Sequence, residues 1–395
     1  MGITRDSIMK SVLLRAPVFS KSGYGVHSRQ IYQYLREKNV DVRIQALSWG
    51  MTPWYVKPED CNGLIGEMQE ITGIEQGRRF DVTIQCQLPN EWDPSLGRYN
   101  IGITAGVEAD RANPNWTMIH VNKMDKVIVP SEFSKKAFMK IGKPNTQIEV
   151  VPESYYEELN LDKTIDVTKD VTTSFNFLTV GVLTGKSPET DRKNLFYLLK
   201  WFVEEFKGNK DVGLIVKTNM GRDTTIDRVK TKRLLAQVLR ELGVQGAPKV
   251  YLLHGEMSRE EMNSLYKSEK VRAYITATRG EGFGLPILEA AVAGLPVVGT
   301  NWSAHTEFMN KGRWLDVKYD LVDVHADRVD GEIFVKDSRW AQVREKDFKH
   351  RIRNFYKKPA VPMEWAKNLS EVLKEQYSIE SIKRHYDEKI GEVLD

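Results

Sequence analysis

Two glutamates, Glu281 and Glu289, are separated by seven residues and lie on either side of a glycine-rich turn. The turn, residues 280–286, reads Gly-Glu-Gly-Phe-Gly-Leu-Pro, follows an apolar run at residues 274–276 and enters a predicted helix. Glycines let backbone N–H groups approach a ligand, and the free N–H groups of a helix start favour phosphate. Carboxylates accept hydrogen bonds from hydroxyl groups. The pattern therefore predicts a site for a phosphate flanked by hydroxylated rings, rather than a generic turn before a buried helix.

At these residues the chain resembles the group 1 retaining glycosyltransferases, a family with the GT-B fold. The resemblance implies an α/β protein in which two Rossmann-like parallel-sheet domains face each other across a cleft. It also implies a nucleotide-sugar substrate, such as a UDP- or GDP-sugar, and no cofactor. In that family the first glutamate contacts the transferred sugar and the second binds the nucleotide ribose, so these roles fall on Glu281 and Glu289. The other expected donor contacts in the turn are Gly282, Phe283, Gly284 and Leu285.

A pair of basic residues, Arg192 and Lys193, opens a predicted helix shortly after a strand that ends near residue 181. The family places an arginine and a lysine here to neutralise the donor diphosphate, and Lys193 matches its lysine. Many members have arginine directly after the glycine that ends the strand, where this chain has Val182. The arginine role is therefore open between Arg192 and Lys186. A capping turn with solvated charges is the alternative interpretation.

A second glycine turn, residues 22–25, follows the first predicted strand. Ser28 stands where the third glycine of a dinucleotide-binding fingerprint would be, so the full Gly-x-Gly-x-x-Gly pattern is absent. The resemblance implies instead that Gly23 and Gly25 approach the donor diphosphate across the cleft. His27, just inside the following helix, is a candidate contact for the acceptor. A surface or packed histidine is the alternative.

Glu108 follows a predicted strand at residues 101–106, and a carboxylate at the carboxyl end of a parallel strand faces the ligand crevice. The surrounding residues are similar to those of a subset of the family, which makes Glu108 a candidate for the acceptor side. A charge at a helix start is the alternative. His305 lies in residues 301–306, which are similar to the family's sugar-contacting loop, and the resemblance implies that it lines the donor pocket.

Residues 49–57 form a predicted loop that is rich in aromatic side chains. Aromatic rings stack on sugars or on exposed bases, so Trp49, Trp54 and Tyr55 are candidate acceptor contacts; anchoring of the loop is the alternative. Two acceptor classes fit the sequence. One is a glycan or small glycoside, and the other is a hydroxylated base in DNA, as in some virus-encoded relatives. The second class requires the base to leave the stack.

The net charge of +4 is unevenly distributed, with the basic excess in residues 175–300. A basic region favours a diphosphate or a polyanion such as DNA, although a solvated helix face is an equal alternative. The residues that contribute most are Lys217, Arg222, Arg228, Lys230, Lys232 and Arg233.

No Asp-x-Asp motif occurs in the chain, so we predict no metal site and a transfer reaction that needs no divalent ion. Charge that builds on the leaving diphosphate would then be stabilised by basic side chains and N–H groups. The resemblance implies a hexosyl- or pentosyltransferase that retains the anomeric configuration. A GT-B nucleotide-sugar epimerase and a non-catalytic sugar-nucleotide-binding protein are the alternatives. The predicted catalytic residues are Glu281, Lys193, Arg192 and Glu108.

These residues are positioned by two series of alternating strands and helices. The chain of 395 residues suits two domains, and short apolar strands between helices indicate parallel sheets. A polar stretch, residues 160–174, is the predicted linker. We predict a first domain at residues 1–172 and a second, nucleotide-sugar-binding domain at 173–376. A C-terminal helix at about residues 377–395 is expected to return to the first domain.

The composition favours a water-soluble enzyme, with 41% hydrophobic and 28% charged residues. No apolar stretch reaches the length of about 20 residues that a membrane span requires, so no integral membrane segment is expected. The two cysteines are too few for a disulfide framework, and we see no secretory signal. We therefore expect a cytoplasmic protein, within the host cell if it is encoded by a virus.

Overall fold

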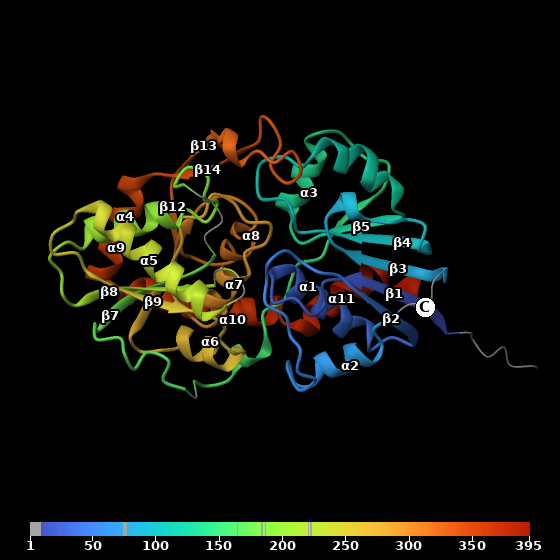
Figure 1. Cartoon of the computed structure of the whole chain (residues 1–395), viewed down its shortest axis with the longest axis horizontal. Coiled ribbons are helices and arrows are strands. Elements are labelled where there is room, and N and C mark those ends of the chain that lie inside the picture. Colours follow the sequence, from blue (N-terminus) through green and yellow to red (C-terminus); the bar gives the residue numbers. More distant parts are fainter. Residues whose placement is uncertain are drawn as a thin grey trace, which may run out of the picture.

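Two six-stranded sheets form the two lobes of the molecule (Figure 1). The computed structural model describes residues 9–73, 77–163, 165–182, 185, 187–219, 221 and 223–395. The strand orders are β2-β1-β3-β4-β5-β6 and β12-β11-β10-β7-β8-β9, and all neighbouring strands within each sheet are parallel. This arrangement confirms the predicted α/β architecture with two parallel sheets.

The central strands of the first sheet are largely apolar and buried on both faces, as is typical of parallel sheets. Its helices begin with capping residues: Ser22 accepts a hydrogen bond from the N–H of Gly25, and Ser131 accepts one from the N–H of Ser134. The strands are β1 Lys10–Ala16, β2 Val40–Ala46, β3 Phe80–Cys86, β4 Gly97–Ile103, β5 Lys126–Val129 and β6 Ile148–Val150. The helices are α1 Gly23–Leu35, α2 Leu64–Glu70 and α3 Glu132–Met139.

The second sheet has the same design, and α7 follows β10 directly through the glycine-rich turn. Its strands are β7 Phe175–Val180, β8 Val212–Thr218, β9 Lys249–His254, β10 Val271–Ile275, β11 Val297–Thr300 and β12 Leu315–Val317. Its helices are α4 Leu195–Glu205, α5 Thr225–Leu242, α6 Arg259–Tyr266, α7 Leu285–Val292, α8 Thr306–Met309, α9 Glu345–Lys357 and α10 Ala360–Gln376. Short 3-10 or π turns occur at Pro89–Glu91, Trp116–His120, Val121–Lys123, Glu157–Asn160, Ala326–Arg328 and Asp387–Gly391.

An antiparallel hairpin that the sequence analysis did not predict follows the second sheet. It pairs β13, Tyr319–Asp323, with β14, Arg339–Val343. The loop between the two strands reaches the first half of the molecule, where Phe334 and Trp340 pack against Ala109. The hairpin therefore joins the two lobes along the upper edge of the view in Figure 1.

The C-terminal helices return to the first lobe. Helix α11, Ile379–Tyr386, continues through a π turn into the short α12, Glu392–Leu394, and it lies beside α1 (Figure 1). Ile382 and Tyr386 are buried in the core of the first sheet together with Ile390. The apolar stripe at the C-terminus thus packs on a sheet made from the other end of the chain. Within the described part of the chain, no helix combines the length and apolar character that spanning a bilayer requires.

We predict that Ile382→Ala lowers the free energy of unfolding by about 2–5 kcal/mol, because it leaves a cavity between α11 and the first sheet. The matched control is Ile226→Ala, whose side chain is 67% exposed on α5 and whose loss is expected to cost less than about 0.5 kcal/mol. Urea denaturation of both variants measures the difference. Equal unfolding midpoints for the two variants would contradict this account of the C-terminal packing.

Candidate active site

The carboxylate of Glu281 lies between two cations from the segment before α4. Lys193 Nζ is 2.7 and 2.9 Å from its two oxygens, and Arg192 Nη1 is 3.2 Å from Oε2. The Thr278 hydroxyl donates a third contact at 2.8 Å. The carboxyl ends of β7 and β10, which are neighbours in the sheet, deliver these residues to the same place. The structure therefore brings together Glu281, Lys193 and Arg192 as one ionic group.

Arg192 also reaches across the boundary between the two halves. Its Nε lies 2.7 Å from Oε2 of Glu108, which follows β4 in the first half. Burial raises the pKa of Glu108, and Arg192 acts in the opposite direction. Burial would likewise raise the pKa of Glu281, but Lys193 and Arg192 outweigh it and hold that pKa at about 2. Glu281 is therefore ionised throughout the physiological range.

The ion pairs with Glu281 and Glu108 limit how Arg192 and Lys193 can bind a donor diphosphate. Arg192 and Lys193 are already bound to carboxylates, so a diphosphate at this position must share them with Glu281 and Glu108. The buried carboxylate of Glu281, the partly exposed carboxylate of Glu108 and the two cations make a group that is close to neutral when all are ionised. An incoming anion is accommodated most easily if a carboxyl takes up a proton or moves away. Lys186, the other candidate for the arginine role, lies outside the described residues.

The glycines of the glycine-rich turn at residues 280–286, here called the donor loop, serve different purposes. Gly284 has φ +103° and begins α7, and among the hydrogen bonds of the described residues none uses the N–H groups of Phe283 or Leu285. Those N–H groups are available to an anion at the helix start. A Cβ atom on Gly282 would overlap the carbonyl oxygen of Ala105 in the first half. Contact between the halves therefore excludes a side chain at position 282, and the donor contact predicted for Gly282 stays a prediction.

Glu289 occupies a different environment, at the wall of a cavity of about 440 Å³ between the two halves. The Tyr266 hydroxyl donates to its Oε2 at 3.0 Å. Burial raises the pKa of Glu289 to about 7, although the Tyr266 hydrogen bond lowers it in part. The two predicted glutamates thus both lie at the boundary between the halves, with opposite shifts in pKa.

Both halves contribute charged and aromatic side chains to this cavity, and the sequence analysis missed several of them. Lys21 precedes the glycine turn at residues 22–25, lies 4.5 Å above the ring of Tyr55 and pairs with Glu256 of the second half at 3.5 Å. Arg259, the first residue of α6, lies on the opposite wall. The sequence could have indicated Lys21 by its place beside a glycine turn, and Arg259 by its place at a helix start. Tyr55 is the predicted acceptor contact that lines the cavity.

Among the other residues of the first half, the structure contradicts the role predicted for His27, whereas the donor contact of the glycine turn stays a prediction. Gly25 is required because a Cβ atom there would overlap the Ser20 carbonyl oxygen, whereas Gly23 has open space around it. His27 is buried, with Nε2 2.9 Å from the Tyr386 hydroxyl, and burial lowers its pKa to about 4. The prediction that His27 contacts the acceptor is therefore corrected: its buried ring connects α1 to Tyr386 of α11.

In the aromatic loop at residues 49–57, Trp49 and Trp54 do not line the cavity, in contrast to Tyr55. Trp49 stacks on Tyr24 with ring centroids 4.1 Å apart, and Trp54 packs on Phe19 while 38% of its surface stays exposed. Trp49 is therefore an anchor of the loop. Trp54 has an exposed part, but it does not line the cavity beside Glu289.

His305 was predicted to line the donor pocket, and the structure places it differently. Its ring is fully buried, with Nε2 2.7 Å from the carbonyl oxygen of Thr300 and Nδ1 3.3 Å from the hydroxyl of Ser303. The ring is therefore engaged in holding the loop that enters α8. We correct its role to support of this loop.

The predicted basic stretch is only partly a surface feature. Lys217 is buried, and its Nζ donates to Asn219 and to the carbonyl oxygen of Gly255, so it does not belong to a basic surface. Arg222 lies outside the described residues. The remaining residues of the predicted stretch, Arg228, Lys230, Lys232 and Arg233, are exposed on α5.

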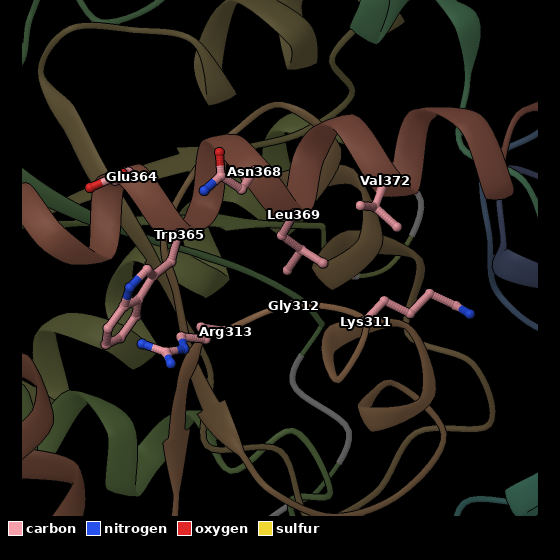
Figure 2. A pocket seen from close by; sticks show the side chains of 8 residues that line it. All are labelled: Lys311, Gly312, Arg313, Glu364, Trp365, Asn368, Leu369 and Val372. Carbon is pink, nitrogen blue, oxygen red and sulfur yellow. The ribbon is translucent and has the colours of Figure 1, made fainter.

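A second cavity, of about 410 Å³, lies away from these residues. Figure 2 shows Trp365, Leu369 and Val372 projecting from α10 toward the loop that carries Arg313. None of the predicted site residues lines it. Among the described residues, no three His, Cys, Asp or Glu side chains are grouped so as to hold a metal ion.

Residues 177–328, which include both cations and both glutamates, match the family model of the glycosyl transferases group 1. The chain carries a group 1 glycosyltransferase domain. This match confirms the prediction of a group 1 glycosyltransferase, and it covers the part of the chain in which the site is concentrated. No curated protein sequence matches the chain.

Solved structures with little sequence identity share the fold of this glycosyltransferase. HepE from Anabaena, in complex with UDP and glucose, is 13% identical with a TM-score of 0.65, over 97% of this chain and 100% of that one. Sucrose-phosphate synthase from Thermosynechococcus elongatus is 12% identical with a TM-score of 0.62, over 98% and 99%. WaaG, a glycosyltransferase involved in lipopolysaccharide biosynthesis, is 12% identical with a TM-score of 0.57, over 95% and 98%. These likenesses confirm the predicted GT-B fold.

We predict that Glu289→Gln stabilises the protein more at pH 8 than at pH 5. The pKa of Glu289 is raised from 4.5 to about 7 in the folded state. Its contribution to stability is therefore complete below about pH 4.5 and is lost as the pH rises through 7. Glutamine cannot ionise, so the variant avoids this loss, which we expect to be on the order of 1–3 kcal/mol because solvent reaches the cavity.

Denaturant unfolding of wild type and Glu289→Gln at pH 5 and pH 8 measures this effect. Glu269→Gln is the control, because its side chain is 90% exposed. An identical stability difference between wild type and Glu289→Gln at the two pH values would show that Glu289 is not buried in its ionised form.

Proposed function

We propose that this glycosyltransferase moves a sugar from a UDP-sugar to a hydroxyl acceptor with retention of the anomeric configuration. The observation that carries the proposal is the position of Glu281 and Glu289 at the boundary between the halves, at the two ends of one loop and helix start. A diphosphate at the N–H groups of this helix start would have a carboxylate on either side. UDP as the nucleotide is supported by the fold likeness to HepE, which was solved with UDP and glucose and with UDP-glucose.

The charge that develops on the leaving diphosphate would be stabilised by Lys193, Arg192 and the N–H groups at the start of α7. Glu281 would accept hydrogen bonds from the transferred sugar, and Glu289 from the ribose. In the proposed retaining reaction the acceptor hydroxyl attacks the same face from which the diphosphate leaves, and its proton passes to a phosphate oxygen. The bond from the sugar to the diphosphate breaks while the bond to the acceptor oxygen forms. We propose that no divalent metal takes part.

The acceptor in this proposal is a hydroxyl group of a glycan or small glycoside. A second candidate, a hydroxylated base in DNA, is supported by the exposed basic face of α5. We further propose a cytoplasmic location, which is supported by two cysteines that are not paired with each other.

We predict that a UDP-sugar raises the melting temperature of the protein and that Glu289→Ala removes about half of the increase or more. A ligand present at 100 times its dissociation constant stabilises the folded state by about 2.7 kcal/mol. Loss of a hydrogen bond from a charged group is expected to weaken binding about ten-fold or more. Thermal-shift measurements with UDP- and GDP-sugars test this, with Glu269→Ala as the exposed control. The absence of a shift with every donor would contradict the proposal.

Product analysis separates transfer from the alternatives. Transfer yields a glycosylated acceptor, and an epimerase converts the donor without acceptor. A non-catalytic binding protein leaves both donor and acceptor unchanged. We expect transfer at the same rate with and without EDTA. A rate that depends on added divalent metal would contradict the metal-independent mechanism.

We predict different salt dependence for the two acceptor classes. If DNA is the acceptor, binding to a duplex that contains hydroxymethylated pyrimidines weakens steeply between 50 and 200 mM salt, because counterion release drives it. Lys230→Glu combined with Lys232→Glu would weaken it further, and the same reversal at Lys357, the last residue of α9, and at Lys358, which follows it, is the control. Transfer to glycosides, with no effect of the α5 substitutions, would establish the first class instead.

A further inference from the structure

Helix α3 of the first half begins directly against the second half. The N–H groups of Glu132 and Phe133 donate to the two carboxylate oxygens of Glu307, at 3.0 and 2.7 Å. Glu307 lies on α8, so a residue of the second half satisfies N–H groups that a helix start leaves without an intrahelical acceptor. The positive end of the helix dipole also favours a carboxylate there. One lobe thus supplies a cap for a helix of the other.

The same turn of α3 holds the donor loop. The Ser131 hydroxyl lies 3.0 Å and the Ser134 hydroxyl 3.4 Å from the carbonyl oxygen of Gly282, the residue after Glu281. The Phe133 ring meets Trp302 edge to face, with centroids 5.1 Å apart. Contact across the boundary is therefore made through the backbone of the donor loop itself.

Glu307 is connected to Glu281 from the other side as well. The N–H of Glu281 donates to the Ser303 hydroxyl at 2.9 Å, and the N–H of Ala304 donates to the carbonyl oxygen of Glu281 at 3.3 Å. Ser303 has φ +84°, a left-handed conformation that is unfavourable for serine and needs support from its surroundings. Ser303 and Ala304, which hold the backbone of Glu281, therefore lie only a few residues before Glu307, whose carboxylate caps α3.

We propose that Glu307 is a positioning residue, which fixes the donor loop around Glu281 only when the two halves are closed. The inference rests on the proposed glycosyltransferase function. When the halves separate, α3 loses its cap from Glu307 and Gly282 loses its hydroxyl donors in the same movement. Glu281 then keeps its cations and its backbone contacts with Ser303 and Ala304, but the adjoining carbonyl group of Gly282 is no longer restrained from the first half. The complete sugar-contacting geometry therefore forms only in the closed protein.

Full-length Glu307→Ala and Glu307→Gln test the proposal. For Glu307→Ala we expect kcat to fall at least about ten-fold, while the dissociation constant for UDP stays within about two-fold, because Glu289 and α7 both belong to the second half and do not depend on closure. The radius of gyration from small-angle X-ray scattering should rise as the halves open. Glu307→Gln should be intermediate, since its amide oxygen can accept one of the two N–H groups. Glu269→Gln is the exposed control.

Transfer at the wild-type rate and an unchanged scattering profile in Glu307→Ala would overturn the proposal. A fall in kcat that only matches a loss of folded protein, measured by circular dichroism, would also overturn it by showing a general structural role. If the wild type neither binds nor transfers any sugar nucleotide, the proposed function fails. The scattering comparison would still show whether Glu307 holds the halves together.

Discussion

The buried carboxylate of Glu281 constrains the arrangement of the site. A carboxylate without partners would be strongly destabilised in this position, and Lys193 and Arg192 supply the compensation. Because Arg192 also pairs with Glu108, the same charge balance connects the two halves. The carboxyl ends of β4, β7 and β10 must therefore meet at one place, which two facing parallel sheets allow. The ion pairs among Glu281, Lys193, Arg192 and Glu108 therefore hold the two lobes together. A donor diphosphate that binds here must rearrange the same ion pairs.

Close contact between backbones completes this boundary. Glycine at position 282 lets the donor loop lie against Ala105, and glycine at position 280 does the same against Glu108. The α3 turn and the β13–β14 hairpin add contacts on the same side of the donor loop, through Glu307 and through Phe334 and Trp340. The conformation of the donor loop is thus coupled to the closure of the lobes. A larger side chain at position 280 or 282, or a wider gap between the lobes, would change both the loop and the closure.

Two carboxylates eight positions apart in the sequence differ by several units in pKa. Glu281 is held at about 2 by adjacent cations, whereas burial near Tyr266 raises Glu289 to about 7. Such a separation lets neighbouring acidic groups take different protonation states and roles at one pH. In the proposed reaction, Glu281 remains an acceptor of hydrogen bonds at all working pH values. Glu289 can gain or lose a proton when a ribose replaces the solvent of the cavity.

The sequence by itself determined the features that arise from local patterns. Short apolar runs between helical segments specify two parallel sheets, and the glycine turn before Pro286 specifies the loop that carries Glu281. It did not reveal the pairing of Arg192 with Glu108, the walls contributed by Lys21 and Arg259, or the cap from Glu307. It also misplaced His27 and His305, whose burial depends on α11 and on the loop before α8. Only the tertiary structure decided these points, because burial and charge pairing depend on segments that are distant in sequence and become neighbours when the lobes pack.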